Sequence, residues 1–331
     1  MDVLSEVLRV IKLEGALFFN AEFSAPWCLM NSGLKGLATF LTPPPEHLII
    51  YHFLTDGRAY TQLPEGKRVE LTAGDIVVYP HGDPHLLGNG FAKPVDSIKT
   101  FSPGLDLVRF GGGGEVTKFV CGYLACDPRL SEVFLAGLPP VLKVHLVKEA
   151  SDQWLENSIR FSVNESNGSN AGSDLVHAKL AELLFVETLR RYINRLPHDE
   201  IGWLAGARDT TIGQALALLH KDPAHPWTIS SLARRVGLSR TRLAERFRHF
   251  LAESPMAYLA RWRLKLAAEI LQSTEDSIAE VAVAVGYETE AGFNRAFKRE
   301  FNSPPAQFRR KRKDVSSISD FANHLKRLER D

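Results

Sequence analysis

The chain is poor in cysteine and has no long apolar run, and these two features argue against a disulfide-rich protein and against a membrane-spanning one. Cys28, Cys121 and Cys126 are an odd number without a C-x-x-C pair, so we expect no disulfide framework. No stretch approaches the roughly 18 apolar residues that span a bilayer. The N-terminus carries acids instead of a basic start followed by an apolar core. We therefore expect a cytoplasmic protein without a membrane partner.

Net charge is almost absent from the whole chain but is unevenly distributed along it. The 331 residues hold 40 Lys and Arg and 39 Asp and Glu, a net charge of +1. Residues 205–331 hold 22 basic and 15 acidic residues, a net charge of +7, which leaves −6 for residues 1–204. A basic C-terminal third indicates a polyanionic partner, although a solvated basic surface is an open alternative. The length predicts about two domains.

Two hydrophobic patterns divide the chain. Up to about residue 125, short β-rich runs alternate with Gly and Pro clusters, which is typical of a sandwich or barrel. The runs are 17–23, 48–54, 58–63, 75–80 and 118–124. From about 127 onward, apolar residues recur at every third and fourth position, most clearly over 174–196, which predicts helices. The small polar stretch 164–173 predicts a loop between two helices.

The last hundred residues contain an internal repeat. Segments 228–259 and 277–308 align with an offset of 49 up to a shared glycine and of 50 after it. The matched pairs are Ile229 with Ile278, Leu232 with Val281, Ala233 with Ala282, Val236 with Val285, Gly237 with Gly286, Leu243 with Phe293, Phe247 with Phe297, Pro255 with Pro305 and Tyr258 with Phe308. One such pattern is common in helical hairpins, but two in register are specific.

Each copy predicts a helix, a tight glycine turn and a second helix. A hydroxyl residue caps each helix, and glycine takes the positive φ that ends the first one. The pairs with these roles are Thr228 and Ser277, Gly237 and Gly286, and Ser239 and Thr289. This is the helix-turn-helix arrangement that places a recognition helix in a major groove. Residues 255–272 predict one long helix that joins the two copies at fixed spacing.

Residues from about 209 to 310 resemble the AraC/XylS family of bacterial transcription regulators. The resemblance is carried by Lys265, Ile278, Ala282, Gly286, Tyr287, Phe293, Phe297, Phe301 and Pro304-Pro305. The front part, through VIKLEGALFFNAEFSAPW (10–27), GDPH (82–85) and CGYLACD (121–127), is similar to the cupin-type N-terminal domain of one branch of that family.

The resemblance implies an α+β multidomain protein with an N-terminal cupin-like β-barrel and a C-terminal all-α tandem helix-turn-helix domain. We expect a regulatory domain over 1–127, a helical connector over 128–206, a DNA-binding domain over 207–310 and a basic tail over 311–331. Double-stranded DNA is the expected partner, and RNA polymerase is a further partner if the protein activates transcription. Activation and repression stay open.

Specific recognition would come from the outer face of each second helix. In the first, Leu243 and Phe247 face inward, and the outward set is Arg240, Thr241, Arg242, Ala244 and Glu245. The resemblance places Thr241, Ala244 and Glu245 where family members contact bases. Glu245 could accept from a cytosine amino group, and arginines such as Arg240 and Arg242 are candidates for phosphate or for structural pairing.

In the second helix the outward set is Glu290, Ala291, Asn294, Arg295 and Lys298. Arg295 is the first choice for bidentate reading of guanine, with Asn294 beside it. The alternative for Arg295 is an ion pair with Glu288 or Glu290.

Residues 74–89 fit the second cupin motif, G-x5-P-x-G-x2-H-x3-N, through Gly74, Pro80, Gly82, His85 and Asn89. In the cupin family this histidine often binds a divalent metal. The first motif is incomplete, because there is no H-x-H and Ile50 stands where the acid belongs. A reduced site of His52, His85 and Cys121 would favour zinc. The alternative is a hydrogen-bonded core cluster without metal.

The resemblance also implies a small-molecule effector inside the barrel and a homodimer. The helix at 174–195 has more apolar surface than one face needs, which suits a dimer interface or packing on the chain's own barrel. Two rival classes stay open. A cupin oxygenase or isomerase would need the full metal ligand set, and a helical protein-interaction module would not bind DNA.

Overall fold

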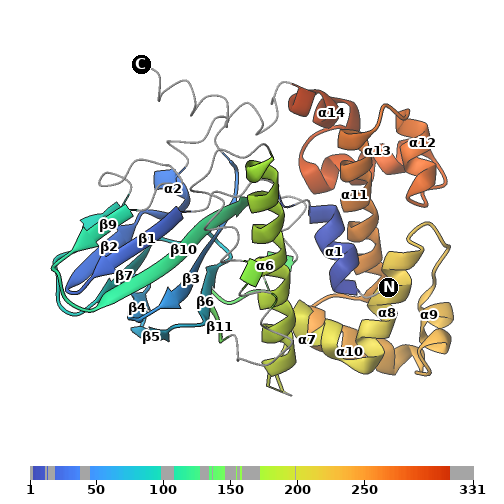
Figure 1. Ribbon diagram of the computed structural model, residues 1–331. Coiled ribbons are helices and arrows are strands. Elements are labelled where there is room, and N and C mark those ends of the chain that lie inside the picture. The colour runs from blue at the N-terminus through green and yellow to red at the C-terminus, as the bar shows by residue number, and fades with distance from the viewer. Residues whose placement is uncertain are drawn as a thin grey trace. The chain divides into compact units, whose positions relative to one another are not determined.

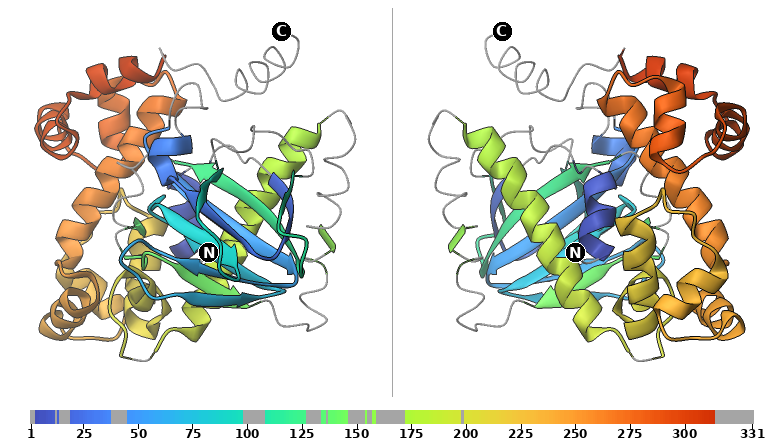
Figure 2. Two further views of the ribbon diagram at one scale, coloured as in Figure 1. Left: turned by 90° about the vertical axis from the view of Figure 1, so that its left-hand side faces the viewer. Right: turned by 90° about the vertical axis from the view of Figure 1, so that its right-hand side faces the viewer.

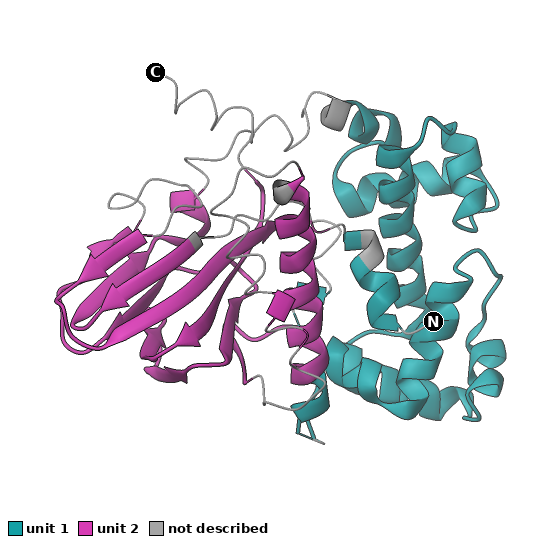
Figure 3. Cartoon of the chain, in the orientation of Figure 1, with its two compact units in different colours: residues 1–12, 127–137, 193–317 teal, residues 13–126, 138–192, 318–331 magenta. Residues whose placement is uncertain are grey.

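The computed structural model describes residues 3–11, 13, 19–37, 45–97, 108–126, 134–135, 137–145, 154, 157–158, 172–197 and 199–313. They fall into two compact units (Figure 3). One unit holds α1 and the helices from α7 to α14. The other holds α2, the described strands and most of α6. The predicted strand-forming runs and the helices over 174–196 and 255–272 are confirmed, whereas the predicted tail over 311–331 lies almost entirely outside the described residues.

The described residues of the strand-bearing unit form two sheets (Figures 1 and 2). The first has the order β11-β6-β3-β10-β1-β9 and the second β5-β4-β7-β2-β8. The strands are β1 (Phe19–Ser24), β2 (Trp27–Asn31), β3 (Leu48–Asp56), β4 (Arg58–Gln62), β5 (Val69–Thr72), β6 (Asp75–Tyr79), β7 (His85–Asn89), β8 (Val95–Asp96), β9 (Val108–Gly111), β10 (Val116–Ala125) and β11 (Leu142–His145). Neighbours pair antiparallel, except β1 with β9 and β2 with β8.

Apolar side chains from both sheets share one core. It includes Trp27, Leu54, Tyr79 and Phe119, each at most 1% exposed. Strands β3 and β6 are buried along nearly their whole length, as expected from their mainly apolar sequences. The aromatic residues of the β-rich region therefore serve mainly as core.

Strand β11 lies inside the segment that the sequence predicted as a helical connector. It pairs with β6 in the register Leu142 to Val78 and His145 to Asp75. Its residues alternate between buried Leu142 and Val144 and exposed Lys143 and His145. This period of two is the strand pattern, but it is too short to stand out between helical segments.

The helices of the other unit are α1 (Val3–Ile11), α7 (Trp203–Arg208), α8 (Thr210–Lys221), α9 (Ile229–Arg235), α10 (Arg240–Leu251), α11 (Pro255–Ser273), α12 (Ile278–Ala284), α13 (Glu290–Phe301) and α14 (Pro305–Lys313). The strand-bearing unit adds α2 (Gly33–Leu37), and α6 spans Ser173–Arg195. Within the described residues, none of these helices has the length and apolar character needed to cross a bilayer. Helix α11 runs from the first hairpin to the second (Figures 1 and 2).

Helix α1 packs with the C-terminal helices, although the sequence prediction assigned its residues to a domain over 1–127. Its apolar residues recur at every fourth position, and Val3, Val7 and Ile11 are each at most 5% exposed. This face meets α8 and α11. The spacing of the apolar residues predicts that one face of α1 is buried, but it does not predict which helices bury that face.

Candidate DNA-binding surface

The first hairpin is formed by α9 and α10. Thr228 caps α9 through a reciprocal capping box with Ser231, and Gly237, whose φ is +72°, turns the chain after the helix. Ser239 then accepts from the Arg242 amide and starts α10. The predicted caps and turn are confirmed.

The second hairpin repeats this geometry with different residues. Ser277 caps α12 through a capping box with Glu280, Gly286 turns the chain at φ +86°, and Thr289 caps α13. Positive φ favours glycine at both turns, because a side chain there is strained. The two glycines lie at equivalent bends.

The recognition helices α10 and α13 bury matching positions. Leu243 and Phe247 in α10, and Phe293 and Phe297 in α13, are fully buried. Of the predicted contact residues, Ala244 and Asn294 are half-buried and the rest are exposed: Arg240, Thr241, Arg242, Glu245, Glu290, Ala291, Arg295 and Lys298. Each hairpin therefore carries a polar outer face of the kind that can meet base edges.

Two arginines of these helices have different surroundings. Arg246, in the turn after the predicted contacts, forms an ion pair with Asp209, which also caps α8. This arginine is therefore a structural residue. In α13, Glu290 accepts a long hydrogen bond of 3.4 Å from Asn294. Arg295 is exposed and extends from the same outer face.

The strand-bearing unit holds a buried histidine pair. His52 on β3 and His85 on β7 are 4% and 1% exposed, and their Nε2 atoms are 2.8 Å apart. The ring of His85 stacks on Tyr79 with centroids 3.6 Å apart. His47 and His81 lie elsewhere, His47 against the Pro80 carbonyl and His81 against that of Leu138.

The hydrogen bonds fix the protons of this pair. His85 donates from Nδ1 to the Asp83 carbonyl at 2.8 Å, so its Nε2 must accept from His52. The Nδ1 atom of His52 then lacks a proton and has no hydrogen-bond partner in the described structure. Burial lowers the pKa of His85 to about 4 and that of His52 well below its ordinary value. Both imidazoles are neutral near pH 7.

The third predicted member, Cys121, pairs with His52 across β10 and β3. Burial raises the pKa of its thiol. Within the described residues, no group of three or more His, Cys, Asp or Glu side chains is arranged to hold a metal ion. What the described residues show at this place is a hydrogen bond between the two histidine rings.

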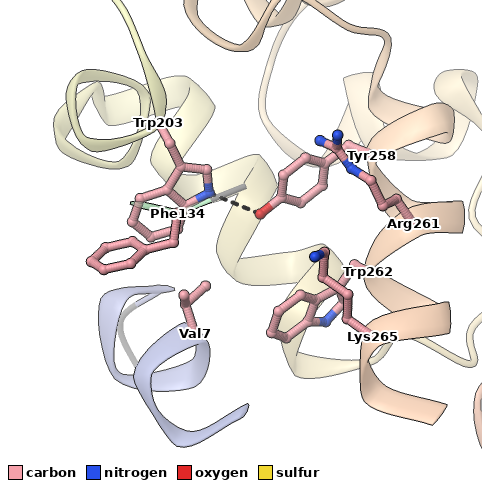
Figure 4. Close-up of a pocket in the computed structure, with 7 residues that line it drawn as sticks. All are labelled: Val7, Phe134, Trp203, Tyr258, Arg261, Trp262 and Lys265. Atoms are coloured by element: carbon pink, nitrogen blue, oxygen red, sulfur yellow. Dashed lines mark hydrogen bonds between the residues drawn. The ribbon is translucent and has the colours of Figure 1, made fainter. Parts of the chain in front are cut away.

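A buried aromatic cluster supports the hairpins and was not foreseen from the sequence (Figure 4). Tyr258 accepts from the Trp203 indole at 2.9 Å and contacts His220 Nε2 at 2.8 Å. His220 also stacks on Trp262 at 3.9 Å. Beside this cluster is a pocket of about 20 Å³, large enough for about one water. Its lining residues are Val7, Phe134, Trp203, Tyr258, Arg261, Trp262 and Lys265.

Comparison with known proteins agrees with this architecture. The cupin family profile matches residues 2–194, and a helix-turn-helix domain profile matches residues 232–311. A cupin region joined to paired helix-turn-helix hairpins defines a DNA-binding transcription regulator. The chain belongs to the AraC family of these regulators.

Relatives match along nearly the full length. The chain is 33% identical over 314 residues to a putative AraC-like transcription regulator of Streptomyces antibioticus, covering 94% of this chain and 99% of that protein. It is 28% identical over 316 residues to the HTH-type transcriptional regulator AlkR of Acinetobacter baylyi, covering 93% and 99%. Both relatives are named transcription regulators, which favours a regulator over the cupin-enzyme alternative.

Several solved structures match about a third of this chain. The C-terminal domain of AraT, a response regulator from Geobacillus stearothermophilus, is 32% identical and covers 31% of this chain and 87% of that chain. Its TM-score is 0.31, so it adds nothing to the assignment made by the family profiles.

Proposed function

We propose that the protein is a cytoplasmic, sequence-specific regulator that inserts α10 and α13 into two successive major-groove segments of one duplex. The observation that carries this proposal is the matched burial of the two helices, which turns equivalent outer faces to solvent. The segments would be about one helical turn, or roughly 34 Å, apart. Glu245, Thr241 and Ala244 read bases in one segment, and Arg295 and Asn294 read bases in the other. Arg240, Arg242 and Lys298 neutralise phosphates, and Glu290 and Ala291 flank the second contact.

Selection of duplexes from a random-sequence library by the full chain tests this function. We expect an enriched site with two conserved segments, and a steep fall of affinity with salt, because each neutralised phosphate releases condensed counterions. A helical module that binds only proteins would enrich no sequence. That outcome would end the DNA proposal.

The strand-bearing unit, in this proposal, takes a small-molecule effector at the His52–His85 pair. The support is the unpartnered Nδ1 of His52, a buried acceptor that a ligand donor would satisfy. An effector that binds one DNA-binding state better than the other shifts their populations. Native mass spectrometry of the full chain measures any retained mass. We expect that mass to disappear in His52→Phe and to persist in His81→Phe.

The exposed apolar side chains of α6 suit a second copy of the chain. Leu175 is 65% exposed, and Val176 and Leu183 are also exposed. A homodimer through this face would place four hairpins on one operator. Sedimentation of Leu175→Asp against the wild type tests it, since a charge in an apolar interface should release monomers. RNA polymerase is a further partner if bound dimers activate transcription.

A further inference from the structure

Arg263, on the helix between the two hairpins, binds three backbone carbonyls at once. Its Nε donates to Pro223 at 2.6 Å, and its two terminal nitrogens donate to His225 at 2.9 Å and to Gly286 at 3.2 Å. The guanidinium is half-buried, and burial lowers its pKa. With its donors turned toward carbonyls of the chain, Arg263 is a poor candidate for a phosphate contact.

The three carbonyls come from both hairpins. Pro223 and His225 belong to the loop that leads into α9, whereas Gly286 is the turn between α12 and α13. The loop is internally braced: Asp222 accepts from the His225 amide at 3.1 Å and from the Trp227 indole at 2.9 Å. Because this loop is held in place, a bond to it fixes the hairpin that follows.

The turn at Gly286 also packs directly on that loop. A Cβ on Gly286 would lie 2.8 Å from Ala224 Cα and 2.9 Å from a terminal nitrogen of Arg263. The equivalent Gly237 has nothing within 4 Å of such a Cβ. The two turns have similar positive φ values, but of the two only the Gly286 turn packs against the loop that leads into α9. The turn of the second hairpin therefore packs on the loop before the first, and Arg263 binds both sides of this contact.

We propose that Arg263 is a positioning residue that sets the separation of α10 and α13, and so the spacing of the two DNA segments that the protein accepts. The planar guanidinium suits this role because its donors form a rigid fork, whereas lysine offers one compact ammonium group. Helix α11 packs against helices of both hairpins, and Arg263 adds a direct hydrogen-bonded link between the turn of the second hairpin and the loop before the first. The inference rests on the two-segment docking proposed above.

Arg263→Lys tests the proposal because it keeps the charge and removes the fork. The probe is the duplex that the wild-type full chain selects, together with versions in which the two segments are moved by one or two base pairs. For the wild type we expect each shift to weaken binding about tenfold, as a lost base contact does. For Arg263→Lys we expect the penalty to shrink below about threefold, with affinity for single-segment duplexes unchanged.

Arg309→Lys is the matched control. Arg309 also donates to carbonyls, those of Leu271 and Asp276, but both flank the second hairpin alone. Its substitution should leave the spacing penalty at the wild-type value. An undiminished penalty in Arg263→Lys would overturn the inference and leave the proposed function standing. A wild type indifferent to spacing would overturn both.

A distance measurement without DNA gives an independent answer. Exposed Arg235 on α9 and Val283 on α12 are replaced by a ketone-bearing amino acid that carries a spin label, which spares the native cysteines. Pulsed electron resonance should show a narrow distance distribution in the wild type and in Arg309→Lys, and a broad one in Arg263→Lys. A narrow distribution in Arg263→Lys would contradict the proposal.

Gly286→Ala provides a second variant should Arg263→Lys fold poorly. It keeps Arg263 but forces the turn away from Ala224, so the preferred spacing should change. Gly237→Ala has the same positive-φ strain without the contact and should keep the wild-type spacing. Equal spacing preferences in the two variants would count against the inference.

Discussion

Glu245 and Arg295 occupy the same position in the two recognition helices and carry opposite charges. Each is the sixth residue of its helix, and both are exposed. A carboxylate accepts from the cytosine amino group, and a guanidinium donates to guanine O6 and N7. The two hairpins therefore present one backbone geometry with side chains of opposite charge at this position.

Arg295→Ala should cost roughly 1–3 kcal/mol of binding free energy and relax selectivity at one base pair. Glu245→Ala should relax selectivity at a base pair of the other segment, because it lies on the other hairpin. Fluorescence anisotropy on single-base variants of the selected duplex measures both. Lys298→Ala is the comparison: as a phosphate contact it should weaken all duplexes alike and lower the salt slope by about one. Uniform weakening by Arg295→Ala would assign Arg295 to the backbone as well.

The two turn glycines should differ in their tolerance of a side chain. Gly237→Ala should cost about 1 kcal/mol of the free energy of unfolding, the strain of a left-handed alanine in open space. Gly286→Ala should cost more, since its Cβ would also meet Ala224 at 2.8 Å. Urea unfolding of the two variants gives the difference directly. Equal losses of unfolding free energy in the two variants would show that the structure near Ala224 shifts to accept the new side chain at no cost.

The histidine pair predicts acid sensitivity of the strand-bearing unit. The native pKa of His85 is about 4, and that of His52 is also lowered, whereas an unfolded histidine titrates near 6.5. The unfolded state therefore binds more protons between these values, so stability is full above pH 6.5 and falls as the pH drops toward 4. The slope should reach up to about 1.4 kcal/mol per pH unit for each histidine.

His85→Gln should flatten this dependence, measured as the urea midpoint at pH 7 and pH 5. Tyr79→Phe is the control, because it keeps the stacked ring and removes only the hydroxyl that bonds Thr61. It should lower the midpoint equally at both pH values. Parallel curves for wild type and His85→Gln would place the acid-sensitive groups elsewhere.

Helix α1 should contribute to the stability of the hairpin unit. Val7 is 5% exposed and lines the pocket beside Trp203 and Trp262. Val7→Ala removes two buried methyl groups and should cost about 1 to 3 kcal/mol, measured by tryptophan fluorescence during urea unfolding. Leu8→Ala, at a half-buried position of the same helix, should cost less. An unchanged midpoint in Val7→Ala would mean that α1 is held only weakly.

The hairpins could be predicted from sequence because their determinants are local. Gly237 and Gly286 mark turns that need positive φ, and Thr228 and Ser277 cap helices through amides three residues away. Each of these sequence signals occurs twice, once in each copy of the repeat. Local rules of this kind depend on neighbours that the sequence shows directly.

The rest could not be predicted because its partners are distant or are backbone atoms. Arg263 binds the backbone carbonyls of Pro223, His225 and Gly286. Because every residue has a backbone carbonyl, no pattern of side chains in the sequence indicates this contact. The pair of His52 and His85 was foreseen, but the third ligand was not decidable, since the thiol's surroundings depend on the packing of both sheets. Strand β11 was missed because four residues give too short a period.

The packing of α1 against α8 and α11 also has a consequence for biosynthesis. The ribosome completes α1 roughly two hundred residues before it makes α8. Until then the apolar side chains of Val3, Val7 and Ile11 lack the helices that bury them in the folded protein, and they stay exposed on the nascent chain. The hairpin unit can reach its final form only after α8 and α11 have been synthesised and have packed against α1.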